Sequence, residues 1–170
     1  MKDTELVAGT AEKMIAFSKG NLKDINHFLK VWSYTRAIAL GEGADAHTLF
    51  ILELTAIVHD ISCPLCRKKY GNTDGRHQEE ESPALILSFF SGFDIPREDV
   101  DRITFLVSRH HTYTGVNSLD WQILLEADYL VNAGEHEDGR DQIESMKERV
   151  FRTETGKRLL ESIYLERSSV

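Results

Sequence analysis

The chain has 170 residues, enough for one compact domain that buries an active-site core. Hydrophobic residues make up 41% and charged residues 28%, which is ordinary globular composition. The net charge of −8 disfavours a nucleic-acid polymer as the main partner, because no basic patch stands out against it. A small anionic substrate is still compatible with this charge, because bound metal ions can make a site locally positive.

Helical patterns run along the whole chain, and they predict an all-α fold, a single-domain helical bundle over residues 1–170. The expected helices cover residues 3–19, 23–40, 46–61, 83–91, 97–110, 119–132, 140–151 and 155–165. The third of these is apolar almost all round, so it should be the central buried helix. The core is expected at about residues 20–135. Residues 140–165 are amphipathic and should pack on its outside, as a cap or as a homodimer element.

Prolines help to set the predicted boundaries. Pro64 is expected to end the central helix near Ile61. Pro83 and Pro96 are expected in the first turns of the helices that follow. No apolar run near 20 residues is evident, so we expect no transmembrane helix. The N-terminus lacks the apolar centre of a signal peptide, and the expected location is the cytoplasm.

The pair His59-Asp60 closes the apolar segment LFILELTAIVHDI. An ionisable pair at the end of a buried run is costly unless something binds it. A divalent metal takes both a neutral imidazole and a carboxylate, and its charge removes the penalty of burying the Asp. The pair is therefore a candidate metal-binding and catalytic element.

Two further residues of the same chemistry lie on apolar helical stripes. His27 shares a face with Val31 and Ile38, which follow it at helical spacing. Asp128 has Leu124 one turn before it on a buried face. Each residue alone fits a hydrogen-bonded core position, but together with His59 and Asp60 they predict a metal site built from three helices.

This set resembles the HD superfamily of metal-dependent phosphohydrolases, whose pattern is H…HD…D. Here the pattern falls on His27, His59-Asp60 and Asp128, and the resemblance covers about residues 20–135. The stretches HQEEE, HHTYT and LLEADYLVN are similar to a small stand-alone bacterial subgroup whose substrates are mostly unassigned. The resemblance implies an HD-domain bundle with one divalent ion, or two, of Mn, Fe, Co, Ni or Mg.

A second metal is implied by the resemblance for two-metal members of the superfamily. His77 and His110 are its candidate ligands, with His111 in reserve. The context of His77 does not match the usual pattern cleanly. With a single metal, His110 or His111 would instead serve as a catalytic proton donor or phosphate contact. Glu53, Glu79 or Glu80 are further candidates for a water-orienting carboxylate, and the sequence does not choose between these three.

The polar stretch from Ser62 to Glu81 is expected to be a loop that acts as a substrate lid. It carries basic residues beside the metal pair, which suit a phosphate group. The candidate substrate-binding residues are Arg67, Lys68, Lys69 and, outside the stretch, Arg109. A solvated loop with scattered charge is the alternative.

Cys63 and Cys66 form the motif CPLC directly after the metal pair. A redox pair and a zinc knuckle are possible interpretations, but no strand precedes the motif and the knuckle lacks ligands. Two reduced thiols in a loop are the favoured interpretation.

The predicted activity is hydrolysis of a phosphoester or phosphoanhydride of a small molecule, with a nucleotide as the leading candidate. A di-iron oxygenase on the same scaffold and a non-catalytic nucleotide-binding regulatory module are the alternatives. The fold alone does not decide between them.

Overall fold

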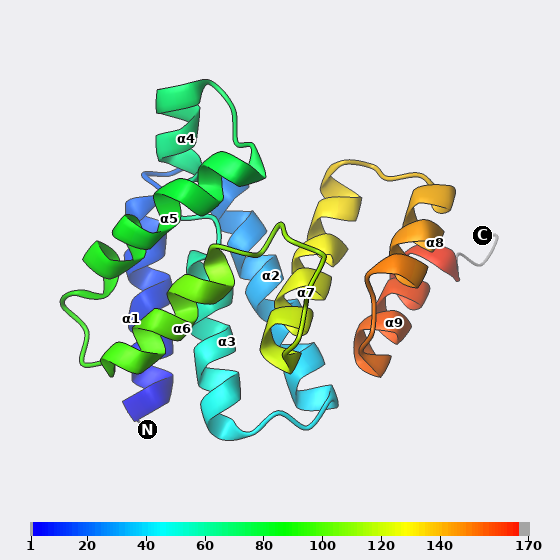
Figure 1. Ribbon diagram of the computed structural model, residues 1–170, viewed down its shortest axis with the longest axis horizontal. Coiled ribbons are helices and arrows are strands. Elements are labelled where there is room, and N and C mark those ends of the chain that lie inside the picture. The colour runs from blue at the N-terminus through cyan, green and yellow to red at the C-terminus, as the bar shows by residue number, and fades with distance from the viewer. Residues whose placement is uncertain (1, 167–170) are drawn as a thin grey trace.

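The structure is a computed structural model that describes residues 2–166, and within this range it contains helices and no strand (Figure 1). The all-α prediction is therefore confirmed. The elements are α1 Lys2–Phe17, α2 Leu22–Gly41, α3 Ala46–Val58, α4 Cys63–Tyr70, α5 Gly75–Phe90, α6 Arg97–Val107, α7 Leu119–Glu135, α8 Arg140–Arg149, α9 Glu154–Leu160, and a π-helical turn Glu161–Leu165.

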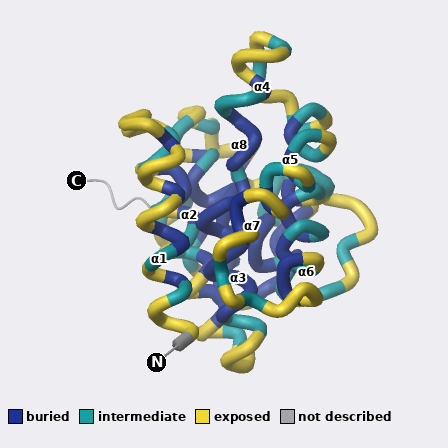
Figure 2. The backbone as a smooth tube through the Cα atoms, turned by 90° about the vertical axis from the view of Figure 1, so that its left-hand side faces the viewer, coloured by how far each residue is buried: buried dark blue, intermediate teal, exposed yellow. Residues whose placement is uncertain are grey.

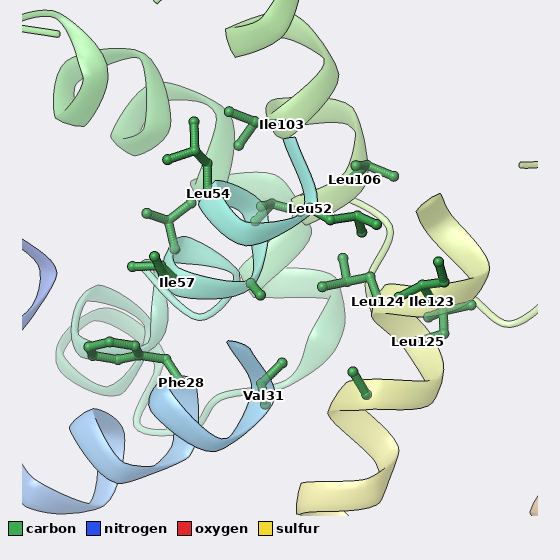
Figure 3. Close-up of a cluster of buried hydrophobic side chains, with 14 of the residues drawn as sticks. Phe28, Val31, Leu52, Leu54, Ile57, Ile103, Leu106, Ile123, Leu124 and Leu125 are labelled. Carbon is green, nitrogen blue, oxygen red and sulfur yellow. The ribbon is translucent and has the colours of Figure 1, made fainter. Parts of the chain in front are cut away.

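The central element is α3, as its all-round apolar sequence predicts. Every residue from Phe50 to Val58 is buried, and α3 packs against α1, α2, α6 and α7. Figure 3 shows Phe28 and Val31 of α2 and Ile103 of α6 closing on the α3 side chains, with α7 alongside. Three helices that supply candidate ligands thus meet in one core.

The segment Ala46–Tyr70 spans 25 residues and contains an 18-residue window with a mean hydropathy of 1.6, so by length and composition it passes as a membrane span. This candidate is weak evidence for a membrane, because 78% of the apolar window is buried inside the fold, as in a core helix. The segment also contains Glu53, His59 and Asp60, so it is not a continuous apolar run, and the absence of a transmembrane helix stays a prediction.

The stretch Ser62–Glu81 is not a loop: it contains α4 and the first half of α5, so the predicted loop is wrong. A lid role for this segment stays a prediction. Pro64 occupies the first turn of α4 instead of ending the preceding helix. The basic residues of α4 lie in its last turn, where their positive charges stabilise the helix by interacting with the negative end of its dipole. Gly71 then ends α4 with φ 73°. In Figure 2, α4 projects from the body with several exposed residues.

Pro83 lies inside α5 and not in its first turn, so the predicted start of that helix is also wrong. A proline there lacks the N–H that would bond the carbonyl one turn earlier. The adjoining turn is held by side chains instead, because the hydroxyls of Ser62 and Ser82 both donate to the carbonyl of Gln78, at 3.3 and 2.5 Å. These bonds tie α5 to the turn after His59-Asp60.

The C-terminal elements α8 and α9 lie beyond α7, on the right of Figure 1. Ile143, Val150 and Leu160 are buried, and α9 contacts α2 and α7. These side chains belong to the main hydrophobic core, so the C-terminal helices complete it. A homodimer role for these helices stays a prediction.

Candidate metal centre

The turn after α3 places His59 and Asp60 side by side in the core. α3 ends at Val58, and His59 is fully buried. Its Nδ1 donates a hydrogen bond to the carbonyl of Ala56 at 2.7 Å, which leaves Nε2 to face the interior. The side chain of Asp60 is 26% exposed and reaches the floor of a cleft.

His27 of α2 and Asp128 of α7 converge on this pair. His27 Nε2 lies 3.1 Å from His59 Nε2, 3.2 Å from Asp128 Oδ1 and 3.4 Å from Asp60 Oδ2. His59 Nε2 lies 3.5 Å from the same Asp128 oxygen. The structure therefore brings together the four residues that the sequence places on three separate helices.

A second group shares Asp60 with the first. One ligand atom each of Asp60, His110 and His111 lies within 4.8 Å of the others, as it does for His27, His59 and Asp60. The two oxygens of Asp60 point to different groups, since Oδ1 lies 3.4 Å from His110 Nε2. Buried His and Asp groups that could hold metal ions are thus present on both sides of Asp60.

His110 and His111 lie in a turn, because α6 ends at Val107 and not at residue 110 as predicted. His110 is fully buried, and its Nδ1 donates to the carbonyl of Val107 at 2.6 Å. The two rings lie next to each other, with centroids 3.9 Å apart. Within the described residues, both Nε2 atoms are buried and have no hydrogen-bond partner. Because buried polar atoms normally have a partner, a metal ion that both nitrogens could bind would account for this arrangement.

The proton affinities of these histidines differ with their surroundings. Burial lowers the pKa of His27, but Asp128, Asp60 and Glu135 more than offset this and raise it to about 9. Burial and the neighbouring His110 lower the pKa of His111 to about 4. Only a neutral imidazole binds a metal ion. With its lowered pKa, His111 is already neutral near pH 7, whereas His27 is protonated and would lose that proton on binding a metal ion.

The carboxyl groups are held ionised. Burial opposes this, but the imidazoles of His59, His110 and His27 lower the pKa of Asp60 well below its usual range. Against the opposing effect of burial, hydrogen bonds from His27 and His59 likewise lower the pKa of Asp128 below its usual range. The centre thus offers two carboxylates and four imidazoles in a mostly buried space, a donor set that suits divalent transition metals.

A cleft of about 450 Å³ opens onto the centre. Its floor includes His27, Asp60, His111 and Asp128. Its walls come from the start of α2, from α4, from the end of α7 and from α8, with these further lining residues: Lys23, Asp24, Cys63, Arg67, Thr73, Gln78, Tyr113, Tyr129, Asn132, Glu135, His136, Asp138, Gln142 and Met146. The centre is therefore accessible to a small molecule.

The four predicted substrate-binding cations occupy different places. Arg67 lines the cleft and forms an ion pair with Asp24. Lys69 is paired with Glu81 and lies over the ring of Tyr70. Lys68 is exposed on α4. Arg109 is also exposed, and its guanidinium covers the ring of Phe105 at 4.3 Å. Of these cations, the structure brings only Arg67 to the cleft.

His77 belongs to neither ligand group. Its ring stacks on Tyr70, with centroids 3.8 Å apart, and Nδ1 lies 3.1 Å from the side-chain oxygen of Asn72. His111, which the sequence analysis named as the alternative candidate, lies beside Asp60 and His110, in the position that we expected for His77. It can do so because Gly75 has no side chain: a Cβ there would lie 2.9 Å from His111.

The three candidate water-orienting glutamates lie outside the cleft lining. Glu53 accepts hydrogen bonds from Trp32 at 3.0 Å and from Arg36 at 2.8 Å, on the α2 side of α3. Glu79 accepts from the hydroxyl of Thr112. Glu80 pairs with Arg76 at the surface. Each of the three carboxylates therefore has a side-chain partner outside the metal centre that accounts for its position.

Cys63 and Cys66 are buried and free, and they lie in α4, so the expected loop around them is wrong. Cys63 lines the cleft and donates through Sγ to the side-chain oxygen of Gln78 at 3.3 Å. Burial, followed by the charge of Asp60, raises the pKa of the Cys63 thiol above its usual range. A raised pKa disfavours the reactive thiolate, in agreement with two reduced thiols.

Sequence reasoning missed Glu135, whose carboxylate lies 3.0 Å from His27 Nδ1. It also missed Lys23 in the cleft wall. A signal for Glu135 was available, because it follows Asp128 by two helical turns on the same face of α7.

No protein-family model matches the chain, and no curated protein matches it. One solved structure is similar, the crystal structure of selenomethionine YpgQ from Bacillus subtilis. The similarity has a TM-score of 0.59 and covers 95% of this chain and 88% of that chain, at 19% sequence identity. At this identity the similarity shows a shared fold. The chain is thus an all-helical protein with a buried His/Asp cluster that could bind metal, compatible with an HD-type domain.

Proposed function

We propose that the protein is a metal-dependent phosphohydrolase that acts on a small phosphorylated molecule, with a nucleotide as the leading candidate. The observation that carries the proposal is the pair of ligand groups sharing Asp60 on the floor of an open cleft. Pairs of divalent ions recur in enzymes that cleave phosphate esters, and Asp60 would supply a ligand to each ion of such a pair.

The residues present fit divalent ions. His27 Nε2 and His59 Nε2 face each other at 3.1 Å, which is unfavourable for two neutral acceptors unless a proton or a cation lies between them. The buried Nε2 atoms of His110 and His111 make no hydrogen bond, although that of His110 lies 3.4 Å from Asp60 Oδ1, and they support the same conclusion on the other side of Asp60. We propose His27, His59, Asp60 and Asp128 as ligands of one ion, and Asp60, His110 and His111 as ligands of another.

Such ions, when bound, polarise a phosphoryl group and lower the pKa of a water molecule. The protein's own residues position the substrate. Lys23 and Arg67 line the wall on the α2 and α4 side, where they can donate to phosphate oxygens. Asn132, His136 and Gln142 line the wall formed by α7 and α8 and offer polar contacts to the rest of the substrate.

The test is metal analysis of the purified protein, followed by a phosphate-release screen over nucleotides and phosphomonoesters with Mn, Ni, Co and Mg. We expect bound divalent metal, and release that stops with a chelator and resumes with metal. His110→Gln should lower release strongly. The exposed His47, which pairs with Asp99 and lies in the first turn of α3, at the opposite end of the helix from His59, provides the matched control His47→Gln.

A di-iron oxygenase remains the second candidate, because the same donor set suits iron. Tight retention of two irons together with oxygen-dependent turnover, and no phosphate release from any substrate, would favour it. A protein that binds nucleotides tightly without turnover would instead be a regulatory module.

A further inference from the structure

The three most deeply buried histidines of the centre are oriented in two different ways. His59 and His110 each donate from Nδ1 to the backbone carbonyl three residues earlier, at 2.7 and 2.6 Å. Their rings are therefore fixed by their own local backbone. His27 has a different partner: its Nδ1 donates to the Glu135 carboxylate at 3.0 Å, across the interface between α2 and α7.

Glu135 is itself held in place. Its other oxygen lies 3.2 Å from Lys30 Nζ, one turn after His27 on α2. Its side chain is 20% exposed and lines the cleft wall. The same helix carries Asp128, so α7 supplies both a candidate ligand and the carboxylate that orients a ligand on the neighbouring helix.

We propose that Glu135 is a positioning residue that fixes the ring and tautomer of His27 and thereby sets the metal affinity of the His27, His59, Asp60 and Asp128 position. The inference rests on the metal ions of the proposed function. A carboxylate that accepts the Nδ1–H keeps the Nε2 lone pair directed at the centre and makes it a stronger donor.

The effect is selective for one of the two positions. His110 is fixed by the carbonyl of Val107, and His111 lies against Gly75. Neither depends on Glu135. Loss of the carboxylate should therefore weaken one ion and leave the other close to its original affinity.

The experiment measures the binding of Mn²⁺ by equilibrium dialysis and of Co²⁺ by its visible absorption, without turnover. Removing an outer carboxylate costs roughly 10–100-fold in metal affinity. We expect that loss at one position in Glu135→Ala and a smaller loss in Glu135→Gln, which keeps an acceptor oxygen but no charge. The Co²⁺ spectrum should change in both variants. Glu144→Gln is the matched control, because Glu144 is exposed on α8 and pairs with Arg140.

A double-mutant cycle identifies the residue through which Glu135 acts. In a His27→Gln background, the further change Glu135→Gln should cause no additional loss in the residual affinity of the His59, Asp60 and Asp128 position, whereas in the wild-type background it weakens that position. Equal weakening of both positions, or full affinity in Glu135→Ala, would overturn the proposal. A wild-type protein that binds neither ion would overturn the metal centre as well, so the two failures are distinguishable.

Discussion

Replacing Asp60 with Asn removes one negative charge and almost preserves the shape of the side chain. Asp60 is the residue that both ligand groups share. Its Oδ2 lies 3.4 Å from His27 Nε2 and 3.7 Å from His59 Nε2, while Oδ1 lies 3.4 Å from His110 Nε2. A single substitution therefore weakens both candidate positions.

The magnitude follows from the lost charge. Two unit charges about 4 Å apart interact by roughly 4 kcal/mol at an effective dielectric constant of about 20. Since about 1.4 kcal/mol corresponds to a tenfold change, each divalent ion should lose affinity by about a thousandfold or more. Helix content should not change, because Asp60 lies in the turn between α3 and α4 and its side-chain ion pairs are to imidazoles.

The assay is elemental analysis after dialysis against a fixed concentration of free Mn²⁺, with circular dichroism as the check on folding. Asp138→Asn is the matched control, because Asp138 lines the same cleft, accepts a hydrogen bond from Tyr129 and belongs to neither ligand group. Undiminished metal content or hydrolysis in Asp60→Asn would refute the shared-carboxylate reasoning.

Three further predictions concern separate parts of the site. Gly75→Ala places a Cβ 2.9 Å from His111, so it should displace that ring at a cost of about 1–3 kcal/mol in stability. Elemental analysis should then show the loss of one of the two ions. A variant that keeps both ions at wild-type affinity would contradict this prediction. Arg67→Ala should reduce kcat/KM about tenfold or more with unchanged metal content, whereas Lys68→Ala should match the wild type; equal kinetics in both would exclude a phosphate contact. Because the pKa of His27 is raised to about 9, its protonation stabilises the metal-free fold fully below about pH 6.5, and this is lost as pH rises through 9. Metal uptake between these values should release protons, and calorimetric heats that are identical in buffers of different ionisation enthalpy would speak against it.

The ligand positions on helices were predictable because helical periodicity fixes the direction of a side chain. His27 and Asp128 lie on apolar stripes of α2 and α7, and both stripes face the core around α3. His59 and Asp60 end the most apolar segment of the chain, so their burial followed from the sequence.

The region after Asp60 was not predictable in the same way. Proline both ends and begins helices, and Pro64 was interpreted as a stop although it occupies the first turn of α4. Pro83 was interpreted as a start, although side-chain hydroxyls hold the turn around it. Both features depend on tertiary contacts between α4, α5 and the turn after α3, which a local pattern does not encode.

The choice between His77 and His111 also depended on tertiary structure. The sequence predicted a helix up to residue 110, which would direct His111 away from His110. In the structure α6 ends at Val107, and the turn that follows brings both rings together. The space for His111 comes from Gly75, distant in sequence. A glycine at the start of a helix predicts nothing about a histidine 36 residues later until α5 and the turn after α6 are placed relative to each other.

The charge of the cleft connects the metal centre to the choice of substrate. Two permanently charged cations line it, and one of them, Arg67, is already paired with Asp24. The carboxylates that line it are those of Asp24, Asp60, Asp128, Glu135 and Asp138. Without metal this surface repels a phosphate group, and two divalent ions would reverse the sign of its charge. Under the proposed function, we therefore expect phosphorylated molecules to bind the metal-loaded protein and not the metal-free one, which a binding measurement with and without chelator would check.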